Sequence, residues 1–268
     1  MFETSLLALR RARAARLGFV DVLHAHAAAE LSERLNEVNR ALPERVLISG
    51  WPAPWQAAVP RLRAIADGDL LDLSEASVDL VVHGLSLHSQ NDPVGQLIQC
   101  RRALRPDGLF VAMLFAGQSL AELRACLAEA EIAVTGGLSP RVHPMADLRD
   151  LGGLLQRAGF ALPVADTQTL TLTYRSLHAL MHDLRAMGEG NVQTARHGPL
   201  TRAILEHADT LYRARFPADD GRIAATVELV TLTGWAPAPS QPQPLRPGSA
   251  TTRLEDALLA LRDKPGED

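Results

Sequence analysis

The pattern of apolar and polar positions divides the chain as far as Ala165 into alternating strands and helices. Short continuous apolar runs predict strands at 45–49, 62–66, 77–83, 109–115 and 161–165. Apolar residues at helical spacing predict helices at 18–40, 92–104, 118–133 and 146–158. Strands that are apolar on both faces and alternate with helices are typical of a parallel sheet covered on both sides. The pattern therefore predicts an α/β fold with a mostly parallel, doubly wound sheet.

The pattern changes after residue 165. Two segments, 167–174 and 223–235, alternate strictly between apolar and polar residues, as antiparallel edge strands do. Helices are predicted at 176–187, 199–216 and 253–262, and a turn at Arg105–Gly108. We therefore expect four parts: N-terminal helices (1–44), an α/β domain (45–165), a cap subdomain with antiparallel edge strands (166–235) and a Pro-rich tail with a short helix (236–268).

Composition narrows the class of protein. The chain has 268 residues and a net charge of −4, so it lacks the basic field that nucleic-acid binding needs. No apolar run approaches the roughly 20 residues of a membrane span. Cys100 and Cys126 have no CxxC spacing, which argues against a disulfide or zinc framework and favours a reducing compartment.

The N-terminal segment is rich in arginine and poor in acidic residues. It contains Arg10, Arg11, Arg13 and Arg16, and we expect them on the solvated face of a surface helix. Such a start also resembles a mitochondrial transit peptide. The predicted compartment is therefore the cytoplasm, with the mitochondrial matrix as the alternative.

A set of sequence tracts points to a family. Ser77–Gly108 reads SVDLVVHGLSLHSQNDPVGQLIQCRRALRPDG and resembles the fourth strand, helix and turn of class I methyltransferases. In order along the chain follow AGQSLAELR (116–124), DLGGLLQRAGF (150–160), LMHDLRAMGEGN (180–191), LTGW (232–235) and RPGSAT (246–251). Together they resemble the group that contains the biotin-pathway malonyl-carrier methyltransferase and, more strongly, the methyltransferase-like assembly factor of respiratory complex I.

This resemblance implies a class I methyltransferase-like, Rossmann-like sheet with a small α+β cap. It also implies S-adenosylmethionine as cofactor and a protein as substrate or partner. The complex I member of the family is regarded as hydroxylating an arginine of a subunit during assembly.

The cofactor loop departs from the family pattern, which is an acidic residue, an apolar residue and then Gly-x-Gly-x-Gly. The corresponding stretch here is Ile48-Ser49-Gly50-Trp51-Pro52-Ala53-Pro54. Ile48 stands where the partner of the methionine ammonium would be. Pro52 and Pro54 have no N–H to offer a ligand, and Trp51 adds bulk. Only Gly50 keeps the freedom that a close backbone approach requires.

A second departure follows the loop. Only sixteen residues separate Gly50 from Asp67, whereas one strand–helix crossover takes at least about 10–12 residues. One crossover fits and two do not, so the first half of the sheet is expected to be shortened. Asp67 or Asp69 could contact the ribose or the adenine, but not both.

The candidate cofactor contacts are Gly50, Trp51, Asp67, Asp69 and His88, the last just past a strand's carboxyl end, where α/β ligands dock. An alternative for His88 is a structural, hydrogen-bonded role. His178 and His182 have a spacing that can bind a metal, but without a third ligand we interpret them as solvated.

The polar residues around Met187 suggest a contact surface or ordinary salt bridging. They are Asp183, Arg185, Glu189 and Asn191. The sequence assigns no catalytic residue and no oligomeric state. Two functions remain. The first is a non-catalytic assembly or regulatory factor that binds a protein partner and has lost S-adenosylmethionine binding. The alternative is an active S-adenosylmethionine-dependent methyltransferase or hydroxylase acting on a protein side chain.

Overall fold

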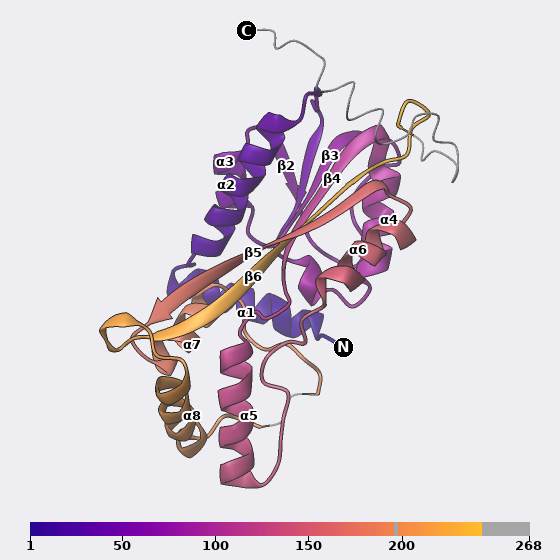
Figure 1. The fold of residues 1–268 in the computed structure, drawn as a ribbon. Helices are drawn as coiled ribbons and strands as arrows, with labels where there is room; N and C mark the ends of the chain where they lie inside the picture. Colours follow the sequence, from indigo (N-terminus) through magenta and orange to yellow (C-terminus); the bar gives the residue numbers. More distant parts are fainter. Residues whose placement is uncertain (196–197, 243–268) are drawn as a thin grey trace, which may run out of the picture. The chain divides into compact units, whose positions relative to one another are not determined.

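The computed structural model describes residues 1–195 and 198–242. Residues Met1–Pro237 form one compact unit, which contains the helices and strands drawn in Figure 1. The helix predicted at 253–262 lies outside the described residues. The division of the chain into four parts stays a prediction.

A six-stranded mixed sheet forms the centre of the unit, in the order β2-β1-β3-β4-β6-β5. The first four strands in that order are parallel: β2 (Leu62–Ile65), β1 (Arg45–Ile48), β3 (Val78–Gly84) and β4 (Leu104–Ala116). The antiparallel pair β6 (Ile223–Trp235) and β5 (Ala161–Tyr174) completes the sheet beside β4. The α/β class and the mostly parallel sheet are confirmed.

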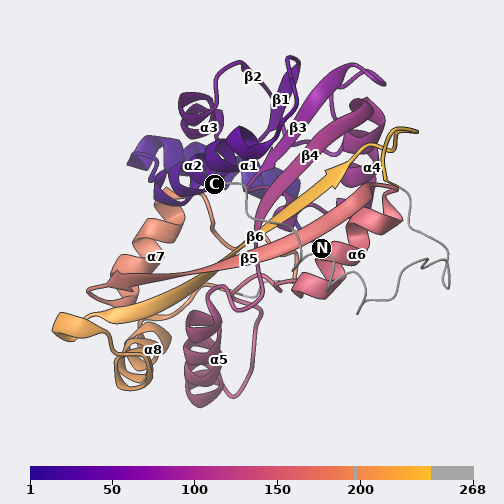
Figure 2. The same ribbon diagram turned by 45° about the horizontal axis from the view of Figure 1, so that its top comes forward.

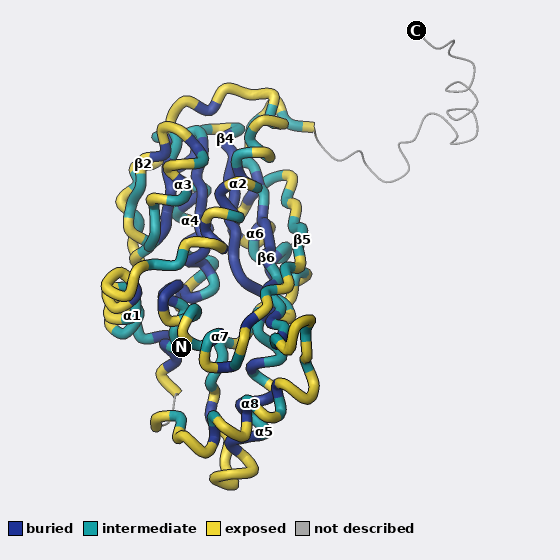
Figure 3. The backbone as a smooth tube through the Cα atoms, turned by 90° about the vertical axis from the view of Figure 1, so that its left-hand side faces the viewer, coloured by how far each residue is buried: buried dark blue, intermediate teal, exposed yellow. Residues whose placement is uncertain are grey.

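Helices cover both faces of the sheet, which explains why its central strands are apolar throughout. On one face α2 (Val22–Glu37) and α3 (Pro52–Ala58) pack over β1, β3 and β4. On the other face lie α4 (Pro93–Ala103) and α6 (Leu148–Arg157). The two layers are seen on opposite sides of the strands in Figures 1 and 2. Figure 3 shows the buried backbone running along the strands between them.

A third core lies beyond the carboxyl end of β4, in the cap. It is built from α5 (Ala121–Thr135), α7 (Leu177–Ala186), α8 (Arg202–Arg215) and the distal halves of β5 and β6. Short 3-10 helices occur at η1 (Leu87–Ser89) and η2 (Asp219–Gly221). The N-terminal helix α1 (Thr4–Leu17) contacts α7 and lies between the sheet and the cap (Figure 1).

Three expectations about individual elements were wrong. The helix expected at 18–40 begins at Val22, because Gly18 has a φ of +86° and ends α1. The turn expected at Arg105–Gly108 belongs to β4, which begins at Leu104. The register between β3 and β4 shifts there, between the pairs Val78–Leu104 and Leu80–Leu109. Asp107 takes a φ of +63° there.

The strands expected at 161–165 and 167–174 are one strand, β5. Asp166 lies between the two expected segments. It is accommodated because Arg34 of α2 donates to both of its carboxylate oxygens, at 3.0 and 2.5 Å. The expectation of a single crossover between the loop and Asp67 is met by β1, α3 and β2.

Candidate functional site

The loop after β1 is closed by its own residues. Ile48 is fully buried in the core where the family pattern has an acidic residue. The Ser49 hydroxyl donates to the carbonyl of Gly84 at 2.9 Å, and the Trp51 N–H donates to that hydroxyl at 3.2 Å. Helix α3 then starts directly with Pro52, which has no N–H to present.

Two tryptophans fill the space around this loop. Trp55 is fully buried, and its indole N–H donates to Nδ1 of His24 at 3.0 Å. The ring of Trp51 stacks on Phe19 with centroids 3.8 Å apart and an interplanar angle of 10°. A Cβ at Gly84 would lie 2.7 Å from the Trp55 ring. Gly84 is therefore required by the close approach of an indole from the same chain.

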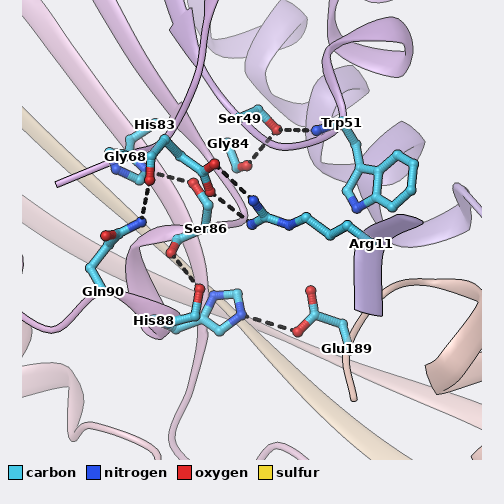
Figure 4. Close-up of polar contacts among 12 residues, drawn as sticks. Arg11, Ser49, Trp51, Gly68, His83, Gly84, Ser86, His88, Gln90 and Glu189 are labelled. Carbon is cyan, nitrogen blue, oxygen red and sulfur yellow. Dashed lines mark hydrogen bonds and ion pairs between the residues drawn. The ribbon is translucent and has the colours of Figure 1, made fainter. Parts of the chain in front are cut away.

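Arg11 of α1 reaches into the carboxyl edge of the sheet, between the loops that follow β1 and β2. Its guanidinium donates to both carboxylate oxygens of Asp67, at 2.8 and 2.7 Å. It also lies over Gly50, where a Cβ would come within 2.5 Å of the guanidinium carbon. Figure 4 shows Arg11 pointing into this cluster beside Trp51 and Gly84. The sheet edge thus brings Gly50 and Asp67 together around an arginine that the sequence placed on a solvated face.

The ion pair controls the charge of Asp67, whose side chain is 9% exposed. Burial alone would raise its pKa, but the hydrogen bonds and charge of Arg11 outweigh burial and hold the pKa below its usual value. Asp69 lies outside this cluster: the residue is exposed, and its carbonyl accepts from the side chain of Gln99 at 2.9 Å. Of the two candidate aspartates, only Asp67 lies against Arg11 beside Gly50.

His88 lies away from Arg11 and Asp67, on the side of the sheet edge that faces the cap. Its Nε2 is 3.3 Å from Oε2 of Glu189, and its ring packs against Phe115 with centroids 5.0 Å apart. Burial is the largest single influence on Glu189 and would raise its pKa, but the charge and hydrogen bond of His88, with smaller contributions from His143 and Arg11, together lower it. Nδ1 of His88 is buried without a hydrogen-bond partner among the described residues.

These residues line a cavity between β4, β6 and the cap. Its volume is about 80 Å³, and it is partly open to solvent. Its polar wall contains His88, His143, Glu189 and Asn191, and its apolar wall includes Leu23, Phe115, Met145 and Val227. Gly50, Trp51, Asp67 and Asp69 do not line it. Of the five sequence candidates, Gly50, Trp51 and Asp67 therefore lie around Arg11, His88 lines the separate cavity, and Asp69 belongs to neither.

Sequence reasoning missed several members of this region. Arg11 was one of four similar arginines, and only the buried Ala14 one turn further marks its side of the helix as the inner one. Glu189 and Asn191 were singled out, yet Glu189 turns inward. His178 and His182 are exposed. Within residues 1–195 and 198–242, no group of three or more potential metal ligands occurs.

The fold and the comparisons agree on the class of protein. A family model described as a methyltransferase domain matches residues 53–112, which begin within the last residues of the stretch 48–54. Among solved structures, the YcgJ protein of Bacillus subtilis covers 80% of this chain and 99% of its own length, with a TM-score of 0.50 and 14% identity. This chain has an α/β methyltransferase-like fold.

Within that class, the similarity in sequence is to two kinds of curated protein. Arginine-hydroxylase NDUFAF5, mitochondrial, of Rattus norvegicus is 40% identical over 205 residues, which are 76% of this chain and 60% of the relative. Malonyl-[acyl-carrier protein] O-methyltransferase of Laribacter hongkongensis is 36% identical over 175 residues, or 65% and 56% of the two chains. The chain therefore spans about 60% of the length of such relatives. In the part of the chain that the structure describes, no helix is long and apolar enough to cross a membrane.

Proposed function

We propose that this chain is a methyltransferase-fold protein that binds a protein partner through the cavity beside the cap and has lost the binding of S-adenosylmethionine. It would act as a non-catalytic assembly or regulatory factor, in the cytoplasm. The observation that carries the proposal is the contact of Arg11 with Asp67 and Gly50, because it fills the cleft in which proteins of this class bind their cofactor.

The residues of the cleft do not fit the cofactor. The methionine ammonium would meet the buried side chain of Ile48 instead of a carboxylate. The carboxylate of Asp67 is already paired with a guanidinium. Each lost hydrogen bond to a charged group is worth about 1.5–3 kcal/mol, so two or three losses weaken binding by several powers of ten.

The test is a calorimetric titration of the whole chain with S-adenosylmethionine up to about 1 mM. We expect no saturable heat, because neither the ammonium nor the ribose meets a free acceptor. A matched variant, Ile48→Asp with Pro52→Gly and Pro54→Gly, restores the family pattern in the loop and controls for the assay. Micromolar binding by the unaltered chain would refute the loss of the cofactor.

The cavity supports the choice of partner. Glu189 carries a lowered pKa and so stays ionised, and the opposite wall is apolar. A long basic side chain suits such a cavity, because its stem packs on apolar groups while its head meets a carboxylate. The name of the arginine-hydroxylase relative indicates the same side chain. We therefore propose that the partner presents an arginine.

A short peptide probes this proposal without knowledge of the partner. We expect acetyl-Gly-Arg-Gly-amide to bind at least tenfold more tightly than its citrulline counterpart, because citrulline has the same shape without the charge. Glu189→Gln should remove that preference, whereas His178→Ala, an exposed position, should keep it. The readout is the shift of amide NMR signals during titration. Equal binding of the two peptides would contradict the proposed partner.

The alternative function is an active S-adenosylmethionine-dependent methyltransferase or hydroxylase acting on a protein side chain. It is favoured by the comparisons, since both kinds of relative are named as enzymes. In that case Arg11 and Trp51 must leave the cleft when the cofactor enters. Micromolar binding of S-adenosylmethionine in the calorimetric titration, together with a mass change of an arginine peptide, would establish this alternative.

A further inference from the structure

The N-terminal helix is attached to parts of the site at its start and at its middle. At its start, the Glu3 N–H donates to the carbonyl of Val192 at 2.9 Å, and the N–H of Thr194 donates to the carbonyl of Met1 at 3.0 Å. Phe2 is buried, and its N–H donates to the side chain of Asn91 at 2.8 Å. The start of α1 therefore joins the loop at 187–194, which carries Glu189, to the loop after β3.

Further along, Arg11 joins α1 to the loops after β1 and β2. Its side chain is 19% exposed and that of Asp67 is 9% exposed, so most of the pair is shielded from water. Gly188 of the cap loop, with a φ of +85°, completes the enclosure. A Cβ there would lie 3.3 Å from Trp51 and 3.6 Å from Cγ of Arg11. The guanidinium of Arg11 thus lies between two sheet loops, and the stem of the same side chain lies near Gly188 in the loop at 187–194 of the cap.

We propose that the guanidinium of Arg11 is a built-in ligand of the carboxyl edge, and that it holds α1, the sheet loops and the cap loop together as a bound molecule would. This inference rests on the proposed function, in which no cofactor occupies the cleft. The two carboxylate oxygens of Asp67 accept from the planar guanidinium, and Gly50 leaves room for it because glycine has no side chain. Removal of the Arg11 head group therefore leaves a site for a small ligand that bears a guanidinium.

The contact with Arg11 explains why Gly50 is the one glycine of the family pattern that is present in the loop. A ligand-binding loop needs its glycines for the ligand's approach, and two of them have become Pro52 and Pro54. Gly50 is the position under the guanidinium, and any side chain there would collide with it. The retained glycine thus serves Arg11. A planar fork that binds a carboxylate through two parallel hydrogen bonds is a property of arginine that lysine lacks.

The test is chemical rescue of Arg11→Ala in the full chain. We expect its melting temperature to fall by about 5–10 °C, because Asp67 is left as a shielded charge without a partner. Addition of about 50 mM guanidinium chloride should recover about 2–4 °C in this variant. The same concentration of tetramethylammonium chloride, a cation without N–H donors, should recover nothing.

Arg13→Ala is the matched control. Arg13 is an exposed arginine of the same helix, and its side chain makes no hydrogen bond or ion pair to any described residue. Guanidinium should leave the melting temperatures of Arg13→Ala and of the unaltered chain unchanged or slightly lower, because its general effect is to weaken folding. The melting temperature of Arg11→Lys should lie between those of the unaltered chain and of Arg11→Ala, and guanidinium should not raise it.

Two results would overturn the inference. One is a melting temperature of Arg11→Ala within about 2 °C of that of Arg13→Ala. The other is a response of Arg11→Ala to guanidinium no different from that of the unaltered chain. If Arg11→Ala does not fold, the double variant Arg11→Ala/Asp67→Asn removes the orphaned charge and must then be more stable than the single one. The cofactor titration is made on the unaltered chain, so each proposal can fail independently.

Discussion

At the scale of single residues, Gly50 and Gly84 are retained for contacts inside the chain. Gly50 lies under the guanidinium of Arg11, and Gly84 lies against the indole of Trp55. Neither glycine has a positive φ, so the need is for space and not for backbone freedom. A glycine at the carboxyl edge of an α/β sheet usually suggests a ligand. Here a side chain of the same molecule makes the approach.

The contact at Gly84 gives a prediction about stability. Gly84→Ala places a Cβ 2.7 Å from the Trp55 ring, and Trp55 is fully buried and cannot retreat. We expect the free energy of unfolding in urea to fall by about 1–3 kcal/mol. The matched control is Gly153→Ala in α6, where nothing lies within 4 Å of the new Cβ. There the change should be neutral or stabilising by up to about 1 kcal/mol.

The same substitution in a Trp55→Leu variant tests whether the indole causes the loss of stability at Gly84. In a Trp55→Leu chain the ring is absent, so the added methyl group has room. We expect Gly84→Ala to cost much less there than in the unaltered chain. An undiminished cost would show that the strain comes from the backbone of β3 and not from the indole.

At the scale of elements, the buried parallel strands were the most predictable part of the fold. Strands β3 and β4 are buried on both faces because helices cover both faces of the sheet. Burial on both faces produces a continuous run of apolar residues, which can be recognised in the sequence. The single crossover between Gly50 and Asp67 was predictable for an equally simple reason, which is chain length. Their meeting at one sheet edge follows, because β1 and β2 are parallel neighbours.

Other elements depended on tertiary partners that a local pattern does not record. The strands expected at 161–165 and 167–174 are one strand, in which Arg34 of α2 pairs with Asp166. Helix α1 has arginines and leucines distributed around its axis, so its sequence does not fix which side faces inward. The inward position of Arg11 is set by contacts of residues 1–3 with the cap loop and by Asp67. Gly50 and Asp67 could therefore be named from the sequence, but the Arg11 side chain that lies between them could not.

At the scale of the whole molecule, buried neutral histidines surround the site and connect its stability to pH. His24 is 3% exposed and His83 is fully buried, and burial lowers the pKa of each to about 4. His24 accepts the indole hydrogen bond through Nδ1, which requires it to stay unprotonated there. Nearby, Asp67 and Glu189 carry pKa values lowered by Arg11 and His88 against the effect of burial.

The unfolded chain therefore binds protons that the folded chain does not. In an unfolded chain the two histidines titrate near pH 6.5, whereas in the fold they stay neutral until about pH 4. Their contribution to stability is complete above about pH 6.5 and is lost as the pH falls toward 4, by up to about 3 kcal/mol for each histidine. Below that range the lowered carboxyl groups begin to protonate, and the loss continues. Burial lowers the pKa of His143 to about 4 as well, so three histidines contribute. We expect the free energy of unfolding in urea, measured at pH 7.5, 6.5, 5.5 and 4.5, to decline with a slope that corresponds to the uptake of up to about three protons on unfolding. His83→Gln should reduce that slope by about one proton, whereas His178→Gln, at an exposed position, should leave it unchanged. A free energy of unfolding that stays constant between pH 6.5 and 4.5 would mean that these histidines accept protons within the fold, and that the site is more open to water than its burial indicates.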